Sequence, residues 1–365
     1  CADRLLALFP NDSVLLARKV GHLTDRACRQ QRLAIVEERC AQSDADPFFL
    51  VEYGDLLNED GRERGRAVKV LRRSSRRWAS NDRLLSVLGS VFWNQRRFDL
   101  AMEHYRLASC LSETSESHSQ AFFQAARYLR RTEEALAFLQ ARFDRFGDKS
   151  GLPAETLHWA LEELDRTEQA MDVLRRAMAR RPDDGRLMIQ AAEAAARRGQ
   201  YDQAEQLLQQ SRNRCRPVDW LRTAALLAGY RNERDRALDG WRQILNIDPC
   251  HAGAHREVAR LLAESEGTRA AVAHLQQAVD CHPHNYRLHQ LLIEWLRDEP
   301  ASEHEAAIRR LIEVSPVDAW ARRELADCLQ RQHRFDEALA EVELACRLDD
   351  SATWGYSIRD SIELN

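Results

Sequence analysis

The stretch LGSVFWNQRRFDLAMEHYRLA, residues 88–108, decides the fold. Phe98, Ala101, Tyr105 and Ala108 within it share one face of a predicted helix, because residues three, four and seven apart are neighbours on an α-helix. The small side chain of Ala101 lets a second helix approach closely at this point. The stretch therefore predicts one packed helix of a two-helix hairpin.

A small residue recurs at the position of Ala101 along most of the chain. The intervals are 33 to 35 residues, and the recurring positions, here called anchors, are Ala67, Ala101, Ala135, Ala170, Ala204, Ala237, Ala271, His304 and Ala338. A weaker tenth anchor falls near Leu33. A period in the low thirties is typical of one helical hairpin per repeat. Because a hairpin cannot bury its apolar stripe alone, we expect neighbouring hairpins to stack into an all-α solenoid.

Other positions keep the same register. A second small or apolar residue follows the anchor by seven residues, at Ser74, Ala108, Ala177, Ser211, Ile244, Ala278, Leu311 and Ala345. A proline follows it by twelve residues, at Pro182, Pro249, Pro283 and Pro316. Proline ends a helix because it lacks an N–H group and disfavours helical geometry in the residue before it. The polar residues that come next are expected to start the following helix, at Asp183, Asp184, Asn285 and Asp318.

This pattern resembles the tetratricopeptide repeat family. Leu88, Gly89 and Phe92 match the family's Leu-Gly-x-x-Tyr pattern. An aromatic residue also precedes the anchor by three positions, at Phe98, Tyr201 and Phe335. The resemblance covers nearly the whole chain and implies a right-handed superhelical solenoid of antiparallel helix hairpins. It further implies that the first helix of each hairpin lines a concave face that binds a ligand.

We expect one elongated domain over residues 1–365, with about nine to ten repeats and weaker repeats in residues 1–80. The Tyr53-Gly54-x-x-Leu57 pattern before Ala67 is offset by one residue from the other repeats. The bulkier His304 is expected to disturb tight packing at its anchor. Both ends interrupt a repeat, which favours a fragment of a longer protein.

The resemblance places aromatic and arginine side chains on the concave face. Aromatic residues and arginine are enriched at binding hot spots because they combine contact area with directional polar groups. The residues predicted to form this peptide-binding groove are Trp93, Arg127, Tyr128, Trp159, Arg222, Tyr230, Arg256, Arg260, Tyr286, Arg297, Trp320, Arg323 and Arg331. The alternative is that several of the aromatics pack inside the hairpins, as we expect for Trp241 and Trp295. Burial of Trp93, Trp159 and Trp320 between helices would exclude the groove.

A groove rich in arginine favours an acidic, extended or carboxyl-ended protein segment as partner, because arginine pairs bidentately with carboxylates. The chaperone-binding members of the family use a Gly-Asn step with lysines nearby. Here Ser90 follows Gly89, and the chain has only three lysines, Lys19, Lys69 and Lys149. A clamp for chaperone tails is therefore not expected.

Composition narrows the function. The net charge is −4, which argues against nucleic acid or membrane as a general partner. The basic run at residues 62–77 could meet nucleic acid, phosphate or an acidic partner, but it reads better as a solvated helix face. No phosphate-binding, dinucleotide-binding or zinc-protease motif is present in the sequence, so we predict no enzyme activity, no cofactor and no metal.

Histidine and cysteine usage add two minor expectations. Seven histidines fall between His251 and His304, yet their spacing matches no zinc signature. Nine cysteines without a C-x-x-C pair suggest reduced thiols and a cytoplasmic location. The excess of arginine over lysine would fit a bacterial gene with high GC content.

Two functions remain open. The first is a non-catalytic scaffold that binds a peptide or partner segment in its concave groove. The second is a substrate-presenting or assembly arm of a larger enzyme, or of an envelope or secretion complex, whose catalytic or membrane domain lies outside this chain.

Overall fold

The computed structural model describes residues 8–9, 12–22, 29–42, 45–113 and 115–348, and these residues form helices and turns without a strand. The chain divides into two compact units, residues 1–191 and 192–365. The helices of the first unit are α2 Ser13–His22, α3 Arg29–Cys40, α4 Pro47–Glu59, α5 Arg64–Arg77, α6 Asp82–Asn94, α7 Phe98–Leu111, α8 Glu116–Tyr128, α9 Thr132–Phe146, α10 Leu152–Glu162 and α11 Thr167–Arg180.

The boundary between the units falls inside α12, Gly185–Arg197. The helices of the second unit are α13 Tyr201–Ser211, α14 Pro217–Tyr230, α15 Arg234–Ile247, α16 Ala252–Glu266, α17 Thr268–Cys281, α18 Tyr286–Leu296, α19 Ala301–Val314, α20 Ala319–Arg331 and α21 Phe335–Leu348. The predicted all-α fold of stacked hairpins is therefore confirmed. That residues 1–365 form one domain stays a prediction.

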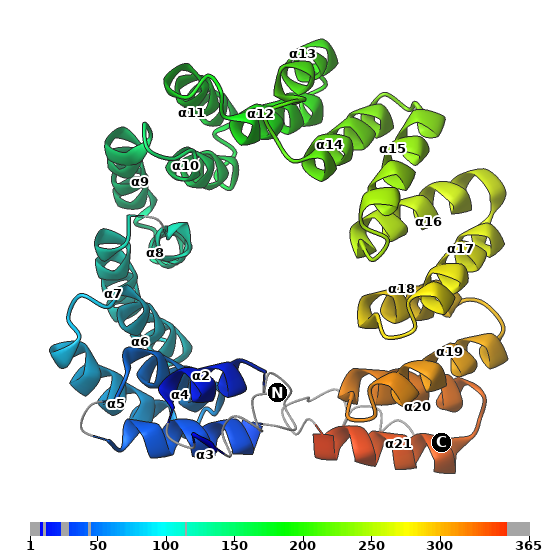
Figure 1. The fold of residues 1–365 in the computed structure, drawn as a ribbon, viewed down its shortest axis with the longest axis horizontal. Helices are drawn as coiled ribbons and strands as arrows, with labels where there is room; N and C mark the ends of the chain where they lie inside the picture. Colours follow the sequence, from blue (N-terminus) through cyan, green and yellow to red (C-terminus); the bar gives the residue numbers. More distant parts are fainter. Residues whose placement is uncertain (1–7, 10–11, 23–28, 43–44, 114, 349–365) are drawn as a thin grey trace. The chain divides into compact units, whose positions relative to one another are not determined.

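Each hairpin consists of an even-numbered first helix and an odd-numbered second helix. In the first unit, α8 and α10 lie on one side of the array and α9 and α11 lie on the other (Figure 1). All nine anchors from Ala67 to Ala338 lie in second helices and are at most 1% exposed. The positions seven residues later are buried as well, at Ser74, Ala108, Ala177, Ser211, Ile244, Ala278, Leu311 and Ala345. The recurring residue is thus the contact point between helices.

Two glycines show how closely the helices of a hairpin approach. A Cβ atom on Gly89 of α6 would lie 2.8 Å from the ring of Tyr105 in α7. A Cβ atom on Gly54 of α4 would lie 2.6 Å from Leu71 in α5. The offset predicted before Ala67 has a simple cause, because the turn between α4 and α5 holds residues 60–63, one more than the turn between α6 and α7 at residues 95–97.

The turns inside the hairpins share a backbone feature that the sequence did not indicate. The residue five positions before the anchor has positive φ in six hairpins, at Arg96, Arg130, Asp165, Gly199, Asn232 and His333, with values from 57° to 74°. This left-handed conformation reverses the chain within three residues. Five of the six residues are not glycine, so the stacked helices impose the conformation.

Capping between hairpins follows the prediction. The Asp184 side chain accepts hydrogen bonds from the backbone N–H groups of Arg186 and Leu187, at 3.2 and 3.3 Å. Asn285 accepts from Arg287 and Leu288 at the start of α18. Asp318 caps α20 by accepting from the N–H of Ala321 at 2.9 Å. The prolines that precede these caps lie two residues after the last residues of α11, α17 and α19.

The exceptional anchor His304 is buried as deeply as the alanines. It is 1% exposed, and Arg331 donates a hydrogen bond from Nη2 to its Nδ1 at 3.2 Å. The Nε2 atom is buried and has no hydrogen-bond partner among the described residues. Burial, together with the charges of Arg331 and Arg297, lowers the pKa of His304 to about 4. The expected disturbance therefore takes the form of an uncharged, partly unsatisfied imidazole.

Candidate functional site

All thirteen predicted groove residues lie on first helices or, for Arg297, at the end of one. Tyr128 and Tyr230 are the most exposed of the aromatics, at 59% and 46%. Trp93, Trp159 and Trp320 are half-buried. The condition that would exclude the groove is therefore not met, and these residues stay a prediction as a binding site.

The half-buried aromatics also connect neighbouring hairpins. The rings of Trp93 in α6 and Tyr128 in α8 have centroids 5.5 Å apart, and Phe98 of α7 lies 4.1 Å from Tyr128. Trp159 of α10 lies 5.3 Å from Phe123 of α8 in an edge-to-face arrangement. These contacts connect neighbouring hairpins, while Trp93 and Trp159 stay partly exposed. Trp241, which we expected in the core, is 5% exposed.

Most of the predicted groove arginines already have carboxylate partners within the chain. These pairs are Arg127–Glu163, Arg222–Glu193, Arg260 with Glu257 and Glu264, Arg297–Glu324 and Arg331–Asp327, at 2.5 to 3.2 Å. Three of them join different hairpins and therefore contribute to stacking. A ligand carboxylate would have to displace a protein carboxylate at these positions.

One pocket on the first-helix face contains two of the predicted residues. It has a volume of about 250 Å³ and opens between α14 and α16, with Tyr230 and Arg260 among its lining residues. The ring of Trp241 from α15 lines it as well. Gly229 lies at the same opening, where an added Cβ atom would meet nothing within 4 Å. The lining is thus mainly apolar and also contains the Tyr230 phenol, the Arg260 guanidinium and the Glu257 carboxylate.

Arg256 lies on α16 four residues before Arg260, so both side chains leave the same face of the helix. Glu257 and Glu264 hold the Arg260 guanidinium at 3.0 and 2.6 Å. Arg256 is exposed and has no carboxylate within ion-pair distance among the described residues. The face of α16 beside the pocket therefore offers one cation that is balanced and one that is available.

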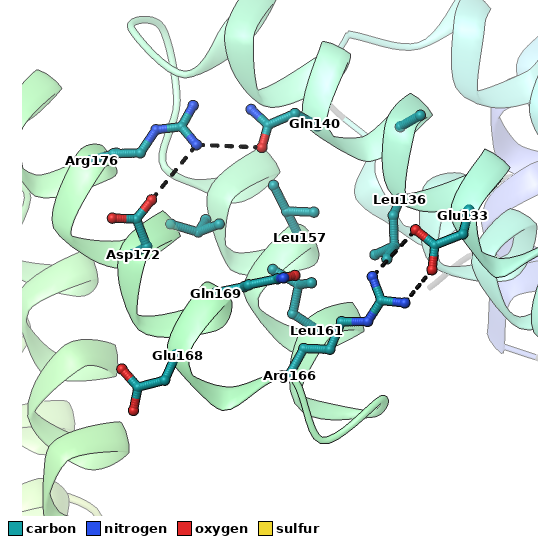
Figure 2. Close-up of a pocket in the computed structure, with 12 residues that line it drawn as sticks. Glu133, Leu136, Gln140, Leu157, Leu161, Arg166, Glu168, Gln169, Asp172 and Arg176 are labelled. Carbon is teal, nitrogen blue, oxygen red and sulfur yellow. Dashed lines mark hydrogen bonds and ion pairs between the residues drawn. The ribbon is translucent and has the colours of Figure 1, made fainter.

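A larger cavity lies on the opposite, second-helix face of the first unit. It has a volume of about 650 Å³ and lies between α9 and α11, over Leu157 and Leu161 of α10 (Figure 2). Arg166 forms an ion pair with Glu133 across its rim, and Arg176 lies 3.4 Å from Gln140 and 3.2 Å from Asp144. Sequence reasoning missed this cavity because it considered the first helices only.

The histidine-rich segment forms a hydrogen-bonded pair. The Nδ1 atom of His255 and the Nε2 atom of His274 are 3.0 Å apart, and His255 donates from Nε2 to the Pro249 carbonyl oxygen at 3.0 Å. Burial lowers the pKa of both rings, that of His274 to about 4. In the part of the chain that the structure describes, no three His, Cys, Asp or Glu side chains form a group able to hold a metal.

Two further observations concern the cysteine thiols and membrane-spanning helices. All seven described cysteines are free thiols; Cys110, Cys250 and Cys281 are exposed, and among these seven only Cys328 is buried. No helix within the described residues is long and apolar enough to cross a bilayer.

The fold and its repeated contacts define a helical repeat protein built from stacked hairpins. Models of the tetratricopeptide repeat match residues 57–110, 161–214 and 304–353. The chain therefore contains tetratricopeptide repeats in these segments, and stacked repeats of this kind serve as protein-interaction scaffolds. No curated protein matches the chain.

Several solved structures resemble it. YrrB, described as a TPR protein with an unusual peptide-binding site, is 14% identical, with 51% of this chain and 97% of YrrB covered and a TM-score of 0.34. A fragment of MamA from Desulfovibrio magneticus is 18% identical, with 47% and 98% covered and a TM-score of 0.34. Cut9–Hcn1 of the APC/C is 11% identical, with 88% and 63% covered and a TM-score of 0.39.

Proposed function

We propose that the chain is a non-catalytic scaffold that holds an extended segment of a partner protein against its first-helix face. The observation that carries this proposal is the pocket between α14 and α16, where Tyr230 and Arg260 surround an apolar recess that reaches Trp241. A recess of about 250 Å³ suits a single aliphatic or aromatic side chain. Burial of such a side chain contributes roughly 1.5–3 kcal/mol.

The charges near the pocket refine the partner's chemistry. Because Glu257 and Glu264 balance Arg260, a ligand gains little by placing a carboxylate there. Arg256, one turn away, is exposed and can pair with a carboxylate. The favoured ligand is therefore an extended segment with an apolar side chain for the pocket and an acidic residue nearby for Arg256. The other predicted groove residues of the second unit would contact the flanking parts of the same segment.

Substitution of Gly229 tests this function with little risk to the fold. Gly229 lines the pocket, and a Cβ atom added there would meet nothing within 4 Å, so a leucine can be accommodated beside the recess. Peptides selected from a random display library on the wild-type chain should carry the apolar and acidic residues. Gly229→Leu should weaken their binding by roughly tenfold or more in calorimetric titrations, and Arg256→Glu should weaken the acidic ones.

The matched control is Gly21→Leu, at an exposed helical glycine where an added Cβ atom also meets nothing within 4 Å. This variant should bind the selected peptides as the wild type does. Equal binding by Gly229→Leu, Arg256→Glu and the control would refute the pocket as the site. The alternative function, an assembly arm of a larger complex, stays a prediction.

A further inference from the structure

Helix α5 carries an unusual concentration of positive charge. Seven of its fourteen residues are Arg or Lys, and none is acidic. Of these, Lys69, Arg73 and Arg76 are exposed and lie three, four or seven residues apart, so they form one row on the helix surface. Like charges at such spacings destabilise a helix by a few tenths of a kcal/mol per pair.

Protein carboxylates balance little of this charge. Arg66 pairs with Glu37 of α3 and with Glu63, which lies 3.7 Å away. Lys69, Arg73 and Arg76, in contrast, have no carboxylate within ion-pair distance among the described residues. The arginines of the first-helix face are mostly paired, whereas this row on a second helix is not. The repulsion within the row Lys69, Arg73 and Arg76 is therefore not offset by a carboxylate among the described residues.

A cavity lies directly beside the row. It has a volume of about 520 Å³ and lies between α3 and α5, over α4. Its lining combines apolar and aromatic side chains with cations of α5, and we call this surface the basic groove, defined by Tyr53, Arg66, Val70, Arg73, Arg77 and Trp78. The Nε1 atom of Trp78 is buried and has no hydrogen-bond partner among the described residues.

Glu37 organises one end of the basic groove. It accepts a hydrogen bond from the Tyr53 hydroxyl at 3.2 Å and forms the ion pair with Arg66. The same carboxylate stands inside the cavity lining, where it would repel a phosphate group that entered. The cavity therefore accepts an apolar side chain, and the cations on its rim accept carboxylates.

We propose that the basic groove is a second docking surface, which takes an acidic segment of a partner protein with an apolar or aromatic side chain inside the cavity. Charge complementarity selects the acidic segment, since Lys69, Arg73 and Arg76 stand exposed beside the cavity. An acidic peptide is favoured over nucleic acid because a peptide can place an uncharged apolar side chain beside Glu37 in the cavity and keep its carboxylates at the exposed cations of α5. The residues of the basic groove lie on α4 and α5 or directly after α5 and are different from those of the pocket between α14 and α16, so the two sites can be tested separately.

The test measures fluorescence anisotropy with a labelled glutamate-rich peptide that contains a central Leu-Phe pair. Wild-type chain should bind this probe, and added salt should weaken the binding. A triple charge reversal, Lys69→Glu, Arg73→Glu and Arg76→Glu, should weaken it by roughly tenfold or more. The neutral triple variant with glutamine at the same positions should also lose affinity, which provides a second reading if the reversed variant does not fold.

The matched control reverses three exposed arginines elsewhere, Arg83→Glu, Arg145→Glu and Arg234→Glu, with the same change in net charge. It should bind the probe nearly as well as the wild type. Gly229→Leu should also leave this binding intact, which separates the basic groove from the proposed function. Three results would overturn the proposal: equal loss in the control triple, no loss in either α5 variant, or tighter binding of labelled oligothymidylate than of the peptide.

Discussion

At the scale of single residues, the anchors determine where the helices pack most closely and where that packing is sensitive to acid. An alanine at eight anchors lets the helices touch, and His304 fills the ninth with an imidazole that is 1% exposed. Arg331 donates to Nδ1, so the proton of the neutral ring is on Nε2, which is buried without a partner among the described residues. A second proton would place a buried cation beside Arg331. Acid should therefore destabilise the helix packing at this anchor.

We expect His304 to make the fold less stable in mild acid. Its pKa is about 4 in the folded chain against a usual value of 6.5, so the unfolded state binds a proton first as pH falls. The free energy of unfolding should then fall between pH 7 and pH 5, with a contribution from this residue of about 2 kcal/mol. Urea unfolding at the two pH values should show a smaller fall for His304→Ala than for wild type. A control at the exposed His284 should keep the wild-type fall, and an unchanged fall in His304→Ala would contradict the assignment.

At the scale of elements, the hairpin turn is as regular as the helices it joins. The left-handed residue recurs five positions before the anchor, although its side chain changes from Arg to Asp, Gly, Asn and His. Glycine adopts this conformation at no steric cost, whereas other residues pay roughly 1–2 kcal/mol. Because the Arg130 side chain is exposed, the backbone φ angle of this residue should determine its contribution to the free energy of unfolding.

Arg130→Gly should therefore stabilise the chain by about 0.5–1 kcal/mol, and Arg130→Val should destabilise it by about 1–2 kcal/mol. The matched control is Arg175→Gly, at an exposed position in the interior of α11, where glycine should cost about 1 kcal/mol. Thermal unfolding measures all three. The same sign for Arg130→Gly and Arg175→Gly would show that the turn conformation does not limit stability.

These elements also show how far the sequence could be read. The anchors, caps and prolines were predictable because each is a residue type at a fixed spacing, as in Ala101, Asn285 and Pro283. The left-handed turns escaped because Arg96 and Arg130 are not residues that signal such a turn. The pairing of Arg127 with Glu163 escaped because an ion pair across 36 residues depends on side-chain geometry in neighbouring hairpins. For the same reason, the sequence predicted Tyr230 and Arg260 as binding residues but did not predict the pocket that they line between α14 and α16.

At the scale of the whole molecule, contacts run between sequence neighbours. Helices pack on the next one or two helices in the chain, as in α6 on α7 and α4 on α6. Such an array behaves as a one-dimensional stack, in which each hairpin stabilises its neighbours and distant hairpins respond weakly. A substitution that disturbs packing in one hairpin should therefore destabilise mainly that hairpin and its neighbours. In a domain with a single core, the same substitution would destabilise the whole domain.

Gly89→Ala should reveal this locality. The added methyl group would lie 2.8 Å from the Tyr105 ring, and the resulting strain should cost about 1–3 kcal/mol despite the better helix propensity of alanine. Hydrogen exchange should become faster in α4 to α9 and stay unchanged in α16 to α21. The control Gly229→Ala adds the same methyl group to a helix where nothing lies within 4 Å, and it should slow local exchange instead. Faster exchange throughout the described chain after Gly89→Ala would mean that the hairpins unfold as one cooperative unit, because only coupling beyond nearest neighbours could carry the fault that far.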